Sequence, residues 1–86
     1  MVVTKRIVAD KIAAYLQHGL TLDQLVDWAE HSLMDAEFEE RDIDTLRTVI
    51  GRLGVADVRA FGLTWEDCEQ ALAQLGFGAR VEIVAT

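Results

Sequence analysis

The sequence contains no proline, a single cysteine and few aromatic residues. Without proline, glycine is left to mark the ends of the regular segments. The lone Cys68 has no partner for an internal disulfide, whereas small secreted domains usually carry several cysteines. We therefore expect a cytoplasmic domain that is held together by its apolar core.

Long apolar runs and an excess of basic charge are also missing. No run is long enough to span a bilayer, and Asp10 and Lys11 interrupt the short apolar stretch near the start, unlike the apolar region of a signal peptide. The chain carries 15 acidic against 8 basic residues, a formal net charge of -7. Because nucleic acids are bound mainly through Lys and Arg, this balance argues against nucleic-acid binding and favours a basic protein as partner.

The chain of 86 residues suffices for a single domain, residues 1–86, with one modest core. Apolar residues recur with helical spacing, which predicts an all-α bundle of four main helices plus a short helical turn. The expected helices cover residues 5–18, 22–35, 41–53 and 65–75, and the turn covers 55–61. The expected core consists of Leu16, Leu25, Ala29, Leu33, Ile43, Leu46, Ile50, Leu53, Phe61, Cys68, Leu72 and Leu75.

The tripeptide Gly-Leu-Thr occurs twice, at residues 19–21 and 62–64, before the second and fourth helices. In each copy the glycine suits the end of one segment and the threonine suits the N-cap of the next. We expect Gly19 to be left-handed and Gln24 to complete a capping box with Thr21. Stop-and-cap chemistry explains the repeat better than duplication of a hairpin, because the apolar positions outside the motif match poorly.

The C-terminal residues 80–85 are β-branched and partly alternating, which favours a short β-strand. A lone strand needs a partner for its backbone donors and acceptors. Residues 1–4 and the same strand of a second subunit are the two candidate partners, so this segment is one route to a dimer.

Acidic residues are densest between Asp35 and Asp44, where they surround the single base Arg41. The run lacks the glycine and glutamate spacing of an EF-hand, so it predicts no calcium loop. It is explained by a solvated loop that favours the start of the third helix, by an acidic docking surface for a basic protein, or by adventitious binding of divalent cations. The second interpretation predicts partner binding by Asp27, Trp28, Glu30, Asp35, Glu37, Glu39 and Glu40.

Trp28 lies off the centre of the apolar stripe of the second helix, with Met34 off the other side. Either a wide stripe is buried between two neighbouring helices, or the indole is exposed as an anchor for a partner. Asp27, His31 and Asp35 follow at i, i+4 spacing. This spacing is typical of a solvated helix face, and a pH-responsive contact and a metal site are the other interpretations.

Neither a Ser/His/Asp arrangement, nor a glycine-rich phosphate loop, nor paired metal ligands occur in the sequence. We therefore expect a protein without catalytic residues, cofactor or metal. In size, acidity and helical content the chain is similar to bacterial antitoxins and nuclease-immunity proteins, although it shares no motif with them. The expected function is a protein-binding module that neutralises or regulates a basic protein. The alternative is a homo-oligomeric structural or regulatory subunit, joined through the C-terminal strand or the Trp28 face.

Overall fold

The fold is seen in a computed structural model that describes residues 2–57 and 62–78. It is an all-α bundle of four main helices, as the helical spacing predicts. The elements in chain order are β1 (Val2–Val3), α1 (Lys5–Leu16), α2 (Leu22–Asp35), β2 (Glu37–Phe38), the 3-10 helix η1 (Glu40–Asp42), α3 (Ile43–Gly54) and α4 (Trp65–Gln74). The strand expected at residues 80–85 and the end of the turn expected at 55–61 lie outside the described residues.

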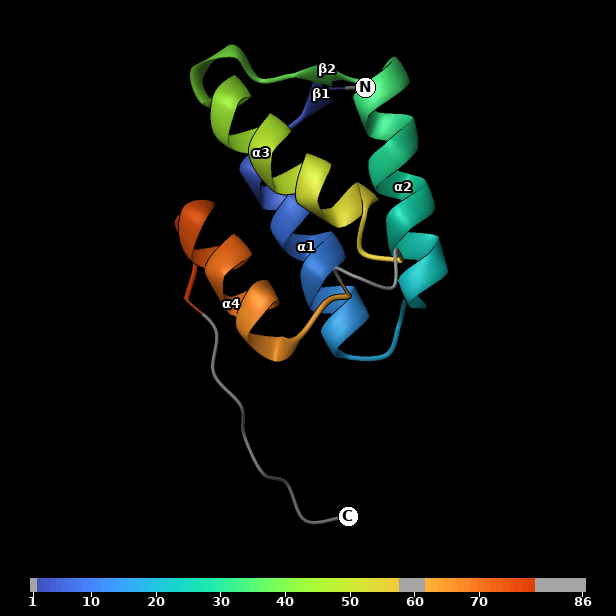
Figure 1. The fold of residues 1–86 in the computed structure, drawn as a ribbon. Coiled ribbons are helices and arrows are strands. Elements are labelled where there is room, and N and C mark those ends of the chain that lie inside the picture. Colours follow the sequence, from blue (N-terminus) through green and yellow to red (C-terminus); the bar gives the residue numbers. More distant parts are fainter. Residues whose placement is uncertain (1, 58–61, 79–86) are drawn as a thin grey trace.

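The helices α2 and α3 share the most extensive contact between elements. In Figure 1, α2 rises along one side, β2 crosses over its upper end, and α3 descends across α1. The lower end of α3 approaches the middle of α2, while the upper ends of the two helices lie far apart. The helix α4 packs against α1 and α3. The helices α2 and α3 therefore diverge toward β2.

The core lies where the four helices meet. Its fully buried members include Ile12 of α1, Leu25 of α2, Leu46 of α3 and Cys68 of α4. One expected core residue is wrong: Leu33 is 43% exposed. It lies in the last turn of α2 beside Gly54 of α3, and this glycine has no side chain to cover it.

Two further core predictions are only partly right. The side chains of Leu16 and Ile43 are half-buried, because each lies at an end of its helix with solvent on one side. The expected core residue Phe61 lies outside the described part of the chain. The start of the third helix also differs from the expectation, since Glu40–Asp42 form the separate 3-10 turn η1 before α3 begins.

The two Gly-Leu-Thr segments cap helices as predicted. The Thr21 hydroxyl accepts a hydrogen bond from the Gln24 N–H at 3.1 Å, and the Gln24 side chain accepts one from the Thr21 N–H at 2.9 Å. The Thr64 hydroxyl and the Asp67 carboxylate form the same reciprocal capping box at the start of α4. Each box satisfies two backbone N–H groups that the helix itself leaves unpaired.

The end of α1 corrects the expected role of Gly19. It is His18 that takes the left-handed conformation, with φ of 64°. The His18 N–H donates to the Tyr15 carbonyl at 3.1 Å, and the Gly19 N–H donates to the Ala14 carbonyl at 2.7 Å. This is the bonding pattern of a Schellman motif with histidine at the left-handed position. The helix consequently ends at Leu16, two residues earlier than predicted.

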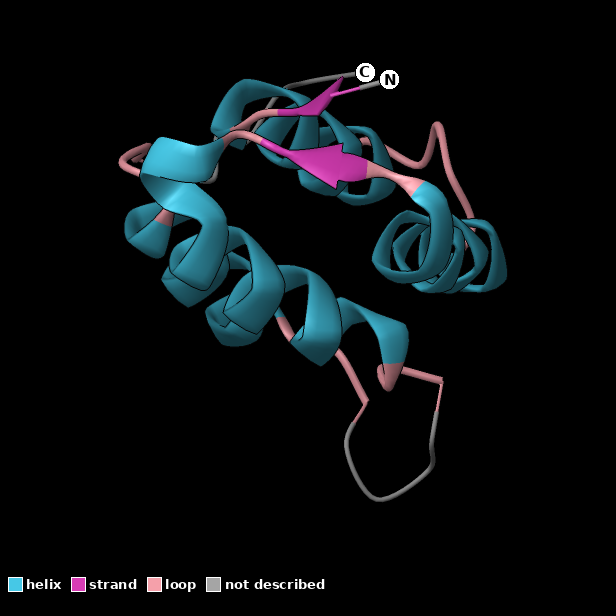
Figure 2. Ribbon diagram, turned by 90° about the horizontal axis from the view of Figure 1, so that it is seen from above, coloured by secondary structure: helices cyan, strands magenta, loops and turns pink. Residues whose placement is uncertain are grey.

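A pair of short strands ties the N-terminus to the connection between α2 and α3. The strands β1 and β2 are parallel, with Val2 opposite Glu37 and Val3 opposite Phe38. Figure 2 shows the pair from above, with β2 between β1 and α3. The described residues pair Val2 and Val3 with β2, while the C-terminal segment, for which residues 1–4 are a candidate partner, lies outside them.

Candidate protein-interaction surface

A shallow groove of about 620 Å³ lies between the end of α2, β2 and the first half of α3. We call it the α2–α3 groove. Its apolar wall is formed by Leu33, Ala36, Phe38 and Ile43, and its polar rim by Glu37, Glu40 and Arg47. The short strand β2 therefore contributes both an aromatic ring to the wall and a carboxylate to the rim.

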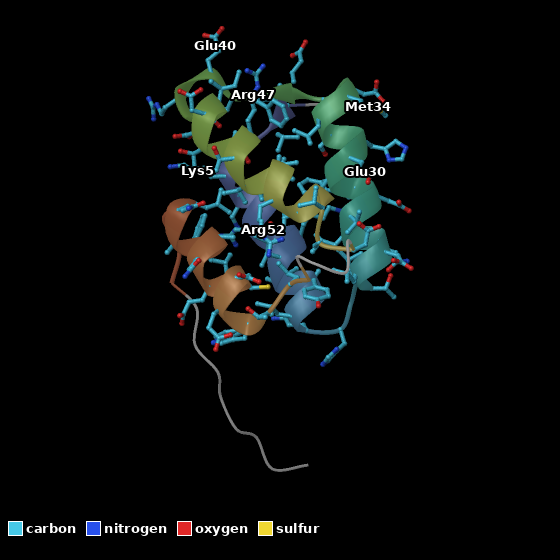
Figure 3. The ribbon with its side chains drawn as sticks, in the orientation of Figure 1. Lys5, Glu30, Met34, Glu40, Arg47 and Arg52 are labelled. Atoms are coloured by element: carbon cyan, nitrogen blue, oxygen red, sulfur yellow. The ribbon has the colours of Figure 1, made fainter. Side chains whose placement is uncertain are left out.

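The structure spreads the predicted acidic residues along α2 and around this groove. Glu37 and Glu40 lie on the rim itself. Glu30 lies where α2 and α3 approach, close to Gly54, and Asp35 is the last residue of α2. Asp27, Glu30, Asp35, Glu37 and Glu40 are exposed, and Glu39 is half-buried. Figure 3 shows Glu30 and Met34 on α2, Glu40 on η1 and Arg47 on α3.

Among the described residues, none of these six acidic side chains forms an ion pair. Several bases are engaged with other groups. The Lys5 ammonium lies 3.7 Å from a carboxylate oxygen of Asp42. The guanidinium groups of Arg6 and Arg52 lie 3.1 Å and 3.2 Å from carboxylate oxygens of Asp10 and Asp67, respectively. Arg41 and Arg47 remain exposed near the groove, where the acids outnumber them. The surface around the α2–α3 groove is consequently rich in unpaired negative charge.

The end of α2 has no compensating charge of its own. Asp35 lies at the C-terminus of the helix, where the backbone carbonyls form the negative end of the helix dipole. No basic residue occupies the last turn. A carboxylate at this end repels the dipole, so it lowers the stability of the isolated helix slightly. A cation supplied from outside the chain would relieve this repulsion.

Exposed apolar side chains accompany the acids. Met34 is 73% exposed and Leu33 is 43% exposed, on neighbouring positions of the last turn of α2. The sequence reasoning noticed Met34 but expected Leu33 to be buried, and it missed the groove. The alternation of Glu37, Phe38 and Glu39 was the available signal for a strand at this place.

Trp28 does not line the groove and is half-buried against the core. The Lys11 ammonium lies 5.7 Å from the centroid of its ring, within the range of a cation–π contact. The indole is thus partly buried, which is less burial than the first interpretation of Trp28 requires and less exposure than the second.

The polar groups that were considered for chemistry lie apart from one another. The ring N–H at Nδ1 of His31 donates to the Asp27 carbonyl oxygen at 2.7 Å, so the histidine contacts the backbone of its own helix. Burial raises the pKa of the Cys68 thiol, and the adjacent Asp67 carboxylate raises it further, which keeps the thiol protonated. Within residues 2–57 and 62–78, no cluster of three His, Cys, Asp or Glu side chains is suited to a metal ion.

A second groove lies at the opposite end of the bundle and is lined by both Gly-Leu-Thr segments. Leu20 and Thr21 line one side, and Leu63 and Thr64 line the other, with Trp65 nearby. Two segments half a chain apart in sequence thus start α2 and α4 from the same region. This proximity was not visible in the sequence, because the repeat was read as two separate local signals.

Comparison of the chain with protein-family models, with curated proteins and with solved structures finds no match. In the described part of the chain, none of the helices has the length and apolar character needed to cross a membrane.

Proposed function

We propose that the protein is a non-catalytic binding module that neutralises or regulates a basic protein partner. The observation that supports this most is the combination of exposed apolar side chains and unpaired acids around the α2–α3 groove. An apolar centre with a charged rim is the usual composition of a protein interface. The rim acids attract a basic surface over a distance, and the apolar centre supplies the contact that water is excluded from.

The proposed contact residues are those that the sequence indicated, together with the groove wall. Glu37, Glu39 and Glu40 attract the partner, while the groove wall with Leu33 forms the apolar centre, and the exposed Met34 follows Leu33 on α2. Trp28 extends the surface toward α1 through its exposed part. The complete set of expected polar and aromatic contacts remains Asp27, Trp28, Glu30, Asp35, Glu37, Glu39 and Glu40.

The test compares wild type with the triple variant Glu37→Lys, Glu39→Lys and Glu40→Lys. A control triple, Asp57→Lys, Glu66→Lys and Glu69→Lys, changes the charge equally at exposed positions away from the groove. The immobilised proteins are used to capture partners from a lysate of the native host, followed by mass spectrometry. We expect basic proteins that bind wild type and the control triple and that are lost from the groove triple.

Binding kinetics with a captured protein then distinguish the effect of rim charge on association from the effect of the Trp28 contact on dissociation. The groove triple should slow association and flatten its dependence on salt, because rim charges act mainly on the association rate. Trp28→Ala should speed dissociation if the indole is an anchor. Equal capture by all three proteins, or association that ignores both salt and the triple reversal, would contradict the proposal.

Self-association is the alternative function. The exposed Leu33 and Met34, with Val2 46% exposed on the adjacent strand, make an apolar area that a second copy is able to cover. Light scattering coupled to size-exclusion chromatography separates the alternatives. A dimer that dissociates in Met34→Lys favours the homo-oligomeric subunit, and a monomer over a wide concentration range favours a foreign partner.

A further inference from the structure

The outer edge of β2 has backbone groups that its partner strand does not use. The Glu39 N–H donates to the Val3 carbonyl at 3.1 Å, and Val3 lies opposite Phe38. In a parallel pair, the N–H and C=O of alternate residues point to opposite edges. Since the backbone groups of Glu37 and Glu39 point toward β1, the backbone N–H and C=O of Phe38 point away from β1.

The opposite edge of β2 borders the α2–α3 groove. Figure 2 shows β2 between β1 and α3, and Phe38 and Ile43 both line the groove. In the described residues, no hydrogen bond occupies the Phe38 N–H or C=O at this edge. The ring of Phe38 packs against the core, which holds the strand in place. The groove is therefore lined on one side by an open strand edge.

We propose that this edge binds an extended segment of a basic partner as an added strand, in the manner of β-augmentation. The proposal rests on the proposed function and names how the partner binds. Alternate side chains of an extended segment point to opposite sides. One set contacts the apolar wall at Leu33 and Ile43, while lysine or arginine side chains of the other set reach Glu37 and Glu40.

The charge of the groove rim favours a basic segment over an acidic one. Glu37 and Glu40 outnumber Arg47 on the rim. An acidic segment would face repulsion from these groups, and a helical segment would leave the Phe38 backbone groups unpaired against the groove. Because β2 is short, the main chain fixes orientation and register, and the side chains supply much of the affinity.

The test begins with a displayed library of random peptides selected on the full-length protein. The strongest binder is synthesised, together with variants methylated at one backbone nitrogen at a time, because methylation removes the donor and blocks the edge. We expect lysine or arginine alternating with apolar residues. N-methylation of the one residue whose N–H donates to the Phe38 carbonyl should weaken binding roughly tenfold, a loss of one good hydrogen bond, while the neighbouring positions tolerate it. The Phe38 amide resonance should shift on binding.

Two variants of the protein complete the test. Glu37→Lys with Glu40→Lys should abolish binding of the basic peptide, and the matched Asp57→Lys with Glu69→Lys should retain it. Peptides that bind the groove but tolerate N-methylation at every position overturn strand addition and leave the acidic docking surface standing. An unshifted Phe38 amide, a helical or acidic consensus, or a library without binders also overturns strand addition. Failure of the lysate capture, by contrast, overturns the proposed function itself.

Discussion

The two ends of α2 differ in how well their charges and backbone groups are satisfied. At the start, Thr21 and Gln24 form a capping box, and Asp23 lies at the positive end of the helix dipole. At the other end, Asp35 lies at the negative end without a basic residue in the last turn, and Met34 is largely exposed. The first end is arranged for stability. The second end is arranged in a way that folding alone does not favour, which is why we place partner binding there.

Truncation of one leucine at each end of α2 should give the largest difference. Leu25 is fully buried, so Leu25→Ala should lower the free energy of unfolding by about 2–5 kcal/mol. Leu33 is 43% exposed, so Leu33→Ala should cost about 1 kcal/mol or less, since less apolar surface is returned to water. Urea unfolding measures both changes. Equal losses would show that the end of α2 is packed as tightly as its beginning.

Removal of the cap hydroxyl should have an intermediate effect. Thr21→Ala, and equally Thr64→Ala, should each cost about 1 kcal/mol, because each leaves an N-terminal N–H without its partner. Thr48→Ala is the control, since its hydroxyl donates to the Asp44 carbonyl inside α3 and caps no helix. This control should be near neutral. Unfolding midpoints of the cap variants that match the control would mean that the capping boxes add nothing.

Charge reversal at the two ends should give smaller effects of opposite sign. Asp35→Lys should stabilise the free protein by about 0.3–1 kcal/mol, and Asp23→Lys should destabilise it by a similar amount. Both changes should shrink in high salt, because exposed charges are screened. If Asp35 binds the partner, its reversal also slows association. A destabilising Asp35→Lys would show that the carboxylate is used within the fold.

The smallest expected effect concerns Asp67 at the start of α4, and it is a change in stability that occurs only at acidic pH. Hydrogen bonding to the Thr64 backbone N–H lowers the pKa of Asp67 below its usual 3.8, despite a smaller opposing effect of desolvation, and the Arg52 guanidinium lowers it further. A group with a lowered pKa in the folded state contributes stability above its unfolded pKa and loses it as pH falls through the folded value. The advantage of wild type over Asp67→Asn should therefore shrink below about pH 4. Urea midpoints at successive pH values measure it, and an advantage that stays constant would contradict this assignment.

The local features were the ones that the sequence predicted well. A capping box links residues three apart, so Thr21 and Gln24 signal it without knowledge of the rest of the chain. The end of α1 was predicted less accurately, with an error of two residues. A Schellman motif places the left-handed residue at C′, and α1 ends early enough for His18 rather than Gly19 to occupy this position.

The groove depended on contacts that no short window contains. Its wall needs β2, which exists because Val2 and Val3 pair with residues more than a third of the chain away. It also needs α2 and α3 to approach at Gly54, which has no side chain to cover Leu33, although the spacing of Leu33 places it on the apolar stripe. Periodicity reports which face of a helix is apolar, but not how far along that face a neighbour extends.

The sequence by itself determined the all-α class, the starts of α2 and α4, and the excess of acidic charge, because helical periodicity, capping and composition act within a few residues or over the whole chain. Only the tertiary structure decided which acids stand unpaired, which apolar side chains remain exposed and which strand edge stays open. These properties depend on the angle between packed helices and on the pairing of distant segments. The candidate interaction surface arises from them.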